Sequence, residues 1–171
     1  MDFSTVVAER FSCKKFDGTK MVETEKLTAI LEAGRLAPTA KNLQEQRIYV
    51  MKSPEALAKI DEVTPCRYGA PLALVVAFDA TNVYTYPGGK RNSGVEDAAI
   101  VATHMMLAAK NEGIDSCWLN NFNPDKLKDL MGLSENEEIL MVLDLGYAAE
   151  DAPKPLNHGN RKSLSETITF M

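Results

Sequence analysis

The chain has 171 residues, of which 45% are hydrophobic, and its formal net charge is -5 at pH 7. This length and composition suffice for a buried core and predict one globular domain over residues 1–171, since domains typically span about 100 to 200 residues. The acidic balance argues against a nucleic-acid-binding protein, whose domains are usually basic.

The first half of the chain alternates helical and extended patterns. Residues 2–10 have an amphipathic helical pattern, and a second helix follows Thr24 and ends near Ala37-Pro38, because a residue before proline avoids the helical region. A loop over residues 38–46 leads into a strand over residues 47–51, and Ser53-Pro54 opens a short helix. Residues 72–78 are a continuous apolar run, which is typical of a buried central strand.

The second half contains a long loop, a strongly apolar helix and a tail. The loop covers residues 79–94, a length often associated with function, and the helix covers residues 95–112, where we expect a core or a subunit interface. A strand over residues 116–119, a helix capped by Asn123-Pro124 and a third apolar strand over residues 139–145 follow. We expect an extended arm over residues 146–161 and a last strand over residues 167–170 that joins a neighbouring subunit's sheet.

The cysteines and the N-terminal residues indicate the compartment. Cys13, Cys66 and Cys117 are odd in number and form no Cys-x-x-Cys pair, so we expect neither a disulfide framework nor a zinc site. Cys13 and Cys66, although they lie beside basic residues, are interpreted as inert small side chains. Residues 1–20 carry charges throughout, and no apolar run approaches the roughly 18 residues that span a membrane. We therefore expect a cytoplasmic protein.

Three separated polar clusters suit one phosphorylated ligand. They are Arg10-Phe11-Ser12-Cys13-Lys14, Asn42-Leu43-Gln44 and Arg161-Lys162. Arginine offers a planar fork, serine a hydroxyl and lysine a compact charge, and together these match a phosphate beside a polyol. Each cluster alone is weak evidence for a ligand site. Basic runs are usually solvated, and Asn and Gln side chains in loops usually form hydrogen bonds with the nearby backbone.

Four motifs follow one another along essentially the whole chain. The first consists of Arg10, Ser12, Lys14 and Phe16, and the second is Ala37-Pro38-Thr39-Ala40-Lys41-Asn42-Leu43-Gln44-Glu45. The third is Cys117-Trp118-Leu119-Asn120-Asn121-Phe122, and the fourth is Gly146-Tyr147-Ala148-Ala149-Glu150 followed by Arg161-Lys162. In this order and spacing they resemble the FMN-dependent nitroreductase family. Thr39 and Glu45 depart from the family's serine and final proline.

The resemblance implies an α+β fold with a central mixed or antiparallel sheet flanked by helices, in a homodimer that exchanges its C-terminal strand and binds FMN at the interface. By matching, the basic residues and Ser12 hold the phosphate and ribityl chain, residues 38–42 approach the flavin from the partner subunit, and the backbone at Asn120-Asn121 faces flavin N5. The implied cofactor-binding set is Arg10, Phe11, Ser12, Lys14, Pro38, Thr39, Ala40, Asn42, Gln44, Trp118, Leu119, Asn120, Asn121, Arg161 and Lys162.

The activity implied by the resemblance is flavin-centred oxidoreduction. NADH or NADPH gives hydride to flavin N5 and leaves, and a small acceptor such as a nitroaromatic or quinone then takes its place, which predicts ping-pong kinetics. No side chain is assigned as nucleophile, general base or metal ligand, and His104 is interpreted as a core histidine. The alternative is a flavin-binding, flavin-sensing or flavin-degrading relative without general reductase turnover, as the Asn120-Asn121 pair and the 79–94 loop suggest.

Overall fold

The computed structural model describes residues 1–153 and 155–171 and has an α+β fold built on one four-stranded sheet. The strands are β1 (Gln46–Met51), β2 (Leu72–Asp79), β3 (Asp115–Leu119) and β4 (Glu137–Gly146), in the spatial order β1-β2-β4-β3. All three pairings between them are antiparallel. The sheet, which was expected to be mixed or antiparallel, is therefore antiparallel.

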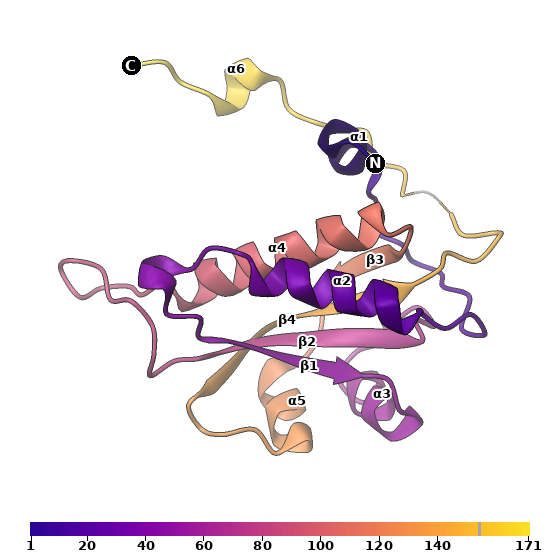
Figure 1. The fold of residues 1–171 in the computed structure, drawn as a ribbon, viewed down its shortest axis with the longest axis horizontal. Coiled ribbons are helices and arrows are strands. Elements are labelled where there is room, and N and C mark those ends of the chain that lie inside the picture. The colour runs from indigo at the N-terminus through magenta and orange to yellow at the C-terminus, as the bar shows by residue number, and fades with distance from the viewer. Residues whose placement is uncertain (154) are drawn as a thin grey trace.

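Helices cover both faces of this sheet (Figure 1). On one face lie α2 (Thr24–Arg35) and α4 (Gly94–Asn111), and on the other lie α3 (Pro54–Asp61) and α5 (Pro124–Met131). Because successive strand residues point to opposite faces, β2 contributes Leu74 and Val76 to the core under α2 and α4, and Val75 to the core under α3 and α5. The prediction that residues 72–78 form a central buried strand is therefore confirmed.

Local sequence signals explain where several helices begin. Asp2 caps α1 (Phe3–Glu9) by accepting a hydrogen bond from the Thr5 N–H at 3.0 Å, and Ser53 caps α3 by accepting one from the Ala56 N–H at 3.2 Å. Asn123 does the same for α5, with Pro124 at the first helical position. The starts of α3 and α5, and the helix and strand order through residue 146, agree with the sequence-based expectations to within a few residues.

The C-terminal segment differs from the expectation. A short helix, α6 (Leu164–Thr167), replaces the start of the strand expected over residues 167–170, and residues 168–171 form no regular element. The local reason is a capping box, in which Ser163 and Glu166 exchange hydrogen bonds. The expected strand is therefore wrong for the chain alone, and its exchange between two subunits stays a prediction.

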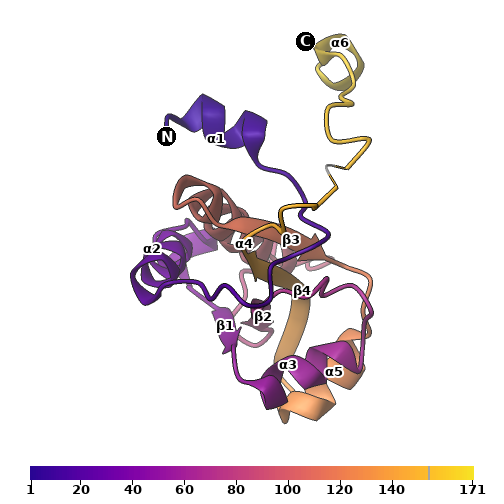
Figure 2. The same cartoon turned by 90° about the vertical axis from the view of Figure 1, so that its right-hand side faces the viewer.

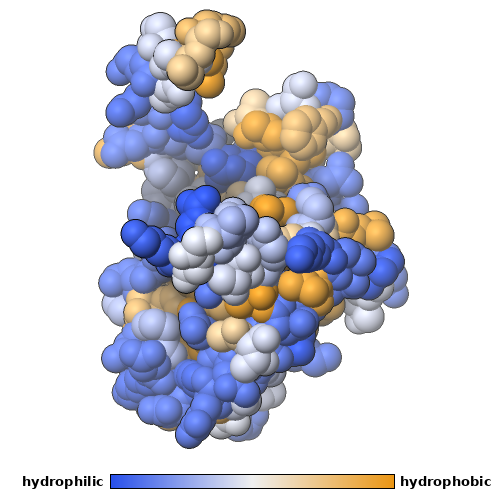
Figure 3. Space-filling model, turned by 90° about the vertical axis from the view of Figure 1, so that its left-hand side faces the viewer, coloured by the Kyte–Doolittle hydropathy of each residue, from blue (hydrophilic) through white to orange (hydrophobic). Residues whose placement is uncertain are grey.

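Two segments project from the body of the molecule, α1 and the C-terminal segment with α6 (Figure 2). Both carry exposed apolar side chains, including Phe3, Leu164 and Phe170, and apolar surface is visible on both in Figure 3. His104 on α4 is also exposed, with Nδ1 at 2.9 Å from the Ile100 carbonyl oxygen, so its interpretation as a core residue was wrong. Among the described residues, no helix is long and apolar enough to cross a membrane.

Candidate functional site

The first basic motif lies along the outer edge of β3. Ser12 forms a parallel bridge with Ser116, and the Cys13 N–H donates a hydrogen bond of 2.9 Å to the Ser116 carbonyl oxygen. Farther along, the Phe16 N–H donates to the Tyr68 carbonyl oxygen at 3.0 Å. Because these backbone contacts fix an extended segment, alternate side chains can project together on one side of it.

Three cations and a hydroxyl from two distant parts of the chain gather around one open cavity of about 270 Å³. The lining residues are Arg10, Ser12, Lys14, Pro155, Asn157, His158 and Arg161. Arg161 is oriented by its own backbone neighbours, since its Nη1 donates to the carbonyl oxygens of His158 at 2.5 Å and Asn160 at 2.8 Å. None of the described residues that line the cavity carries a carboxylate, so the donor set fits a phosphate group. Lys162 is exposed and does not line it.

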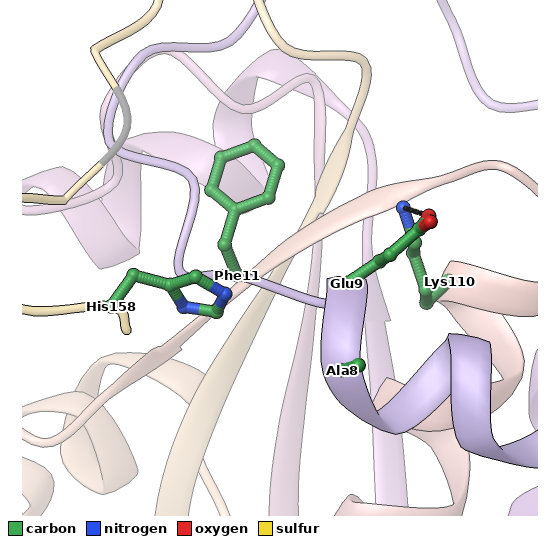
Figure 4. Close-up of a pocket in the computed structure, with 5 residues that line it drawn as sticks. All are labelled: Ala8, Glu9, Phe11, Lys110 and His158. Carbon is green, nitrogen blue, oxygen red and sulfur yellow. Dashed lines mark ion pairs between the residues drawn. The ribbon is translucent and has the colours of Figure 1, made fainter. Parts of the chain in front are cut away.

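A second cavity, of about 470 Å³, adjoins the first and shares His158 with it (Figure 4). Phe11 and His158 meet edge to face with ring centroids 6.4 Å apart, which attaches the C-terminal arm to the first motif. Glu9 and Lys110 form an ion pair of 3.4 Å on the other side of this cavity. Phe11 therefore connects the arm to the segment and does not line the phosphate-sized cavity.

The third motif forms the turn that follows β3. The Trp118 Nε1–H donates to Asn120 Oδ1 at 2.8 Å, and the Thr64 hydroxyl donates to the Asn121 carbonyl oxygen at 2.6 Å. Leu119 is buried beneath the turn, while the side chains of Asn120 and Asn121 are exposed. The backbone of this turn is thus fixed on two sides, and it belongs to the same edge of the sheet as the basic motif.

The three thiols have different surroundings. Hydrogen bonds from Tyr68, Asn121 and Thr64 lower the pKa of Cys66, with a smaller contribution from the charge of Lys14. Burial raises the pKa of Cys13 and raises that of Cys117 to about 12. The interpretation of Cys13 as inert agrees with its burial, whereas Cys66 is partly exposed and has a lowered pKa, which makes it the most reactive thiol of the three.

The second motif lies at the opposite end of the strand order, next to β1. Residues Ala40–Asn42 form a single 3-10 turn, and Pro38, Asn42 and Gln44 are exposed. The Ala40 N–H donates to Asp97 Oδ1 at 3.0 Å, which fixes the turn against the start of α4. Within the part of the chain that the structure describes, no hydrogen bond or ion pair joins residues 38–44 to the basic cavity. One chain therefore presents the predicted binding residues in two separate places.

Buried carboxyl groups are features that the sequence did not indicate. Glu45, Asp97 and Asp144 are 0%, 3% and 0% exposed. Burial, followed by contact with Asp97, raises the pKa of Glu45 to about 7, and burial raises that of Asp144 to about 9. The departure of Glu45 from the motif's proline was the one available signal. No group of three His, Cys, Asp or Glu side chains among the described residues is arranged to hold a metal ion.

Comparisons of the sequence and of the structure with known proteins point to the same family. The model described as the Nitroreductase family matches residues 7–67 and 64–147 of this chain. A solved nitroreductase family protein from Clostridium difficile 630 is 35% identical, with a TM-score of 0.92, and the match covers 99% of this chain and 98% of that one.

Two further relatives carry more specific descriptions. YodC of Bacillus subtilis strain 168, whose name describes an NAD(P)H nitroreductase, is 26% identical over 97% of each chain. A protein from Exiguobacterium sibiricum 255-15, solved in complex with FMN, is 20% identical with a TM-score of 0.87, over 100% of this chain and 98% of that one. At that identity the second likeness concerns the fold alone.

The thiol surroundings predict selective labelling. A disulfide reagent such as Ellman's should modify Cys66 first, because the other two thiols are buried with raised pKa values. The Cys66→Ser variant should lose the fast phase, while Cys13→Ser and Cys117→Ser, if folded, should keep it. Absorbance of the released thiolate measures the rates, and a fast phase that persists in Cys66→Ser would contradict the assignment.

Proposed function

This chain belongs to the nitroreductase family, and we propose that it is an FMN-dependent oxidoreductase that carries hydride from NADH or NADPH to a small acceptor such as a nitroaromatic or quinone. The observation that carries this proposal is the basic cavity formed by Arg10, Ser12, Lys14 and Arg161, whose first three residues lie on the segment along β3. When bound, FMN would supply hydride acceptance and donation at N5, and the protein would supply binding and orientation.

The basic cavity would bind the FMN phosphate and the ribityl chain. Arg10 and Arg161 bring planar forks for bidentate contact with phosphate oxygens, Lys14 brings a compact charge, and the Ser12 hydroxyl can donate or accept at the polyol. Because Arg10, Ser12 and Lys14 come from the segment along β3 and Arg161 from the arm, binding would also hold the arm against the body.

The turn after β3 would serve the flavin ring. Its backbone is held by Trp118 through the Asn120 side chain and by Thr64 through the Asn121 carbonyl group. A donor that is fixed before reaction stabilises developing negative charge without reorganising, which is the role proposed for a backbone N–H of this turn. Trp118 and Leu119 would act by positioning the turn, since Leu119 is buried and Trp118 is half-buried.

We also propose a homodimer in which residues 38–44 of one subunit complete the site of the other. Support comes from the separation of these residues from the basic cavity, and from the exposed apolar side chains of α1, α4 and the C-terminal segment. On α4, Ile100, Thr103 and His104 line a shallow outward-facing cavity together with Ala99. A second copy would cover these apolar surfaces, as an obligate interface does.

One observation favours the alternative of a flavin-binding protein without general reductase turnover. The Lys41 ammonium lies 4.8 Å from the centroid of the Tyr84 ring, so the 79–94 loop rests against the segment proposed to approach the flavin. A loop fixed in this place would restrict the entry of a nicotinamide ring. The two functions differ in one property, which is reduction of the bound flavin by NADH or NADPH.

The test of the proposed function is an absorbance spectrum of protein reconstituted with FMN and desalted, before and after anaerobic addition of NADH and then NADPH. Retained flavin bands that bleach with either donor are the expected result. Retained bands that stay oxidised would favour the alternative, and loss of all flavin on desalting would contradict FMN binding.

A single substitution tests the phosphate assignment. Arg10→Ala should weaken FMN affinity by about 1 to 3 kcal/mol, the scale of one hydrogen bond to a charged group, with little effect on folding. Flavin fluorescence titration measures the affinity. Arg35→Ala is the matched control, because Arg35 is exposed and paired with Glu32 far from the cavity. Equal FMN affinity in Arg10→Ala and wild type would remove Arg10 from the site.

Removal of the C-terminal segment tests the dimer. Truncation after Arg161 deletes exposed apolar residues, including Leu164 and Phe170, and should raise the dimer dissociation constant because it removes proposed intersubunit contacts. Multi-angle light scattering over a dilution series measures the change. A chain that lacks only Met171 is the control, and identical dissociation of wild type and truncated protein would exclude a role for the segment.

A further inference from the structure

The segment between α2 and β1 has a strained backbone. Lys41, Asn42 and Gln44 have φ values of 53°, 56° and 54°, in the left-handed backbone region that residues other than glycine rarely occupy. Such conformations persist only where surrounding contacts over-determine them. The contacts that hold residues 39–44 therefore decide whether the segment keeps this shape.

Several of these contacts lie in solvent. The Gln44 N–H donates to the Thr39 hydroxyl at 3.1 Å, and Asn82 Nδ2 donates to the Leu43 carbonyl oxygen at 3.1 Å, both in exposed positions. Water competes for such groups, so hydrogen bonds of this kind add little net stability. They do not by themselves explain a segment that maintains three left-handed residues.

The two ends of the segment are held by residues whose side chains are buried, Asp97 and Glu45. At the beginning, the Ala40 N–H donates to Asp97 Oδ1 at 3.0 Å. At the end, the side chain of Glu45 is 0% exposed, and its backbone carbonyl oxygen accepts from the Asp79 N–H at 2.9 Å. The Asp97 carboxyl group on α4 thus holds the start of the segment, and Glu45, through its backbone hydrogen bond and its buried side chain, anchors the end.

The two carboxyl groups are in contact with each other. Glu45 is within hydrogen-bonding reach of Asp97, yet Glu45 Oε2 and Asp97 Oδ2 have no partner if both groups are ionised. The Ser93 hydroxyl lies 3.5 Å from Glu45 Oε1, at the limit of a hydrogen bond. One proton shared between the two unpartnered oxygens would satisfy both, whereas two buried negative charges would repel each other.

The neighbouring charges do not replace this proton. From β1 and β2, Arg47 and Asp79 face each other at 3.7 Å, and Arg47 Nη1 donates to the backbone carbonyl of Glu45 and not to its carboxylate. Among the described residues, the Glu45 and Asp97 carboxyl groups have no ion pair with a Lys or Arg side chain.

The remaining titratable groups near the pair are engaged elsewhere. In the 79–94 loop, Tyr86 is hydrogen-bonded to Glu96 and its ring lies 4.4 Å from the Arg91 guanidinium carbon. Lys41, on the segment itself, lies over the ring of Tyr84. The pair is therefore a nearly isolated acidic site, in which protonation is the available means of removing the repulsion.

We propose that Glu45 and Asp97 share one proton and act as a clasp on residues 39–44, and that loss of this proton releases the segment and weakens binding of the phosphorylated flavin. The clasp consists of these two side chains alone. Its effect on flavin binding rests on the proposed function, whereas its effect on the segment does not. Both act as positioning residues, since neither is assigned a contact with the ligand.

The direction of the pH dependence follows from the pKa of Glu45. Burial, followed by contact with Asp97, raises it from the ordinary value of 4.5 to about 7. A group whose pKa is raised in the folded state contributes stability that is full below the ordinary pKa and is lost as the pH rises through the raised one. The clasp should therefore be closed in mildly acidic solution and open above about pH 7.

Trypsin cleavage of the flavin-free chain tests the clasp directly. Lys41 is exposed within the segment, and cleavage there follows the population of the open form. The ratio of cleavage after Lys41 to cleavage after Lys162 in the exposed arm cancels the pH dependence of trypsin itself. In wild type this ratio should rise at least about threefold from about pH 6 to about pH 8.5. A flat ratio would overturn the proposal.

The isosteric variant Glu45→Gln supplies the discriminating comparison. Its amide can donate to Asp97 at any pH, so the cleavage ratio should stay low and flat across the same range. Asp97→Asn keeps an oxygen for the Ala40 N–H and an amide for Glu45. It replaces Glu45→Gln as the test variant if that protein does not fold. Glu96→Gln is the matched control, since it removes an exposed carboxylate next to Asp97 and should behave as wild type. A rise in the isosteric variants equal to that in wild type would exclude the shared proton.

The consequence for the ligand is measured separately by FMN titration. If binding needs the closed clasp, affinity in wild type should fall by up to about tenfold per pH unit above pH 7, and the fall should be smaller in Glu45→Gln. Equal falls in both proteins would overturn the link to binding, since titration of the FMN phosphate affects them alike. Absence of FMN binding at every pH would contradict the proposed function, while the cleavage ratio would still decide the clasp.

Discussion

The pairing of β2 with β4 is the constraint on which the rest of the structure depends. Both strands lie between two others, and β2 is buried along seven of its eight residues, so neither face of the pair can be left to solvent. Two helix layers are therefore required, and they come from α2 and α4 on one face and from α3 and α5 on the other (Figure 1). The edge strands β1 and β3 take their positions from this pair, and both halves of the candidate site are attached to them.

The separation of the site into two halves follows from this arrangement. The basic motif lies along β3 and the strained segment leads into β1, and two central strands separate those edges. A rigid sheet keeps its opposite edges apart, which supports the proposal that a second chain supplies one of the two sets of residues to each ligand. The proposed dimer would bring the two sets of residues together, and it would also give a reason for the exposed apolar residues of α1 and α6.

Buried acids give the interior an unusual electrostatic character. Asp144 is fully buried on the core face that also contains Cys117, and burial raises its pKa to about 9, with Arg67 acting in the opposite direction. Burial is also the main cause of the raised pKa of Glu45. In each group burial favours the neutral form relative to an exposed carboxyl group, so each contributes stability that is full in acid and is lost as the pH rises through its raised pKa. The surface, by contrast, carries exposed ion pairs, each of which adds little to the stability of the fold.

The sequence alone determined the order of elements and most of their ends, because these depend on signals within a few positions, and its resemblance to a family supplied the candidate binding residues. Caps such as Ser53 and Asn123 and the apolar run of β2 are local in this sense. Only the tertiary structure decided that the sheet is antiparallel, that the basic motif and Arg161 share a cavity, that hydrogen bonds lower the pKa of Cys66, and that Glu45 meets Asp97. Each of these depends on residues that are far apart in the chain. Their burial and mutual approach arise from packing, which no local pattern encodes.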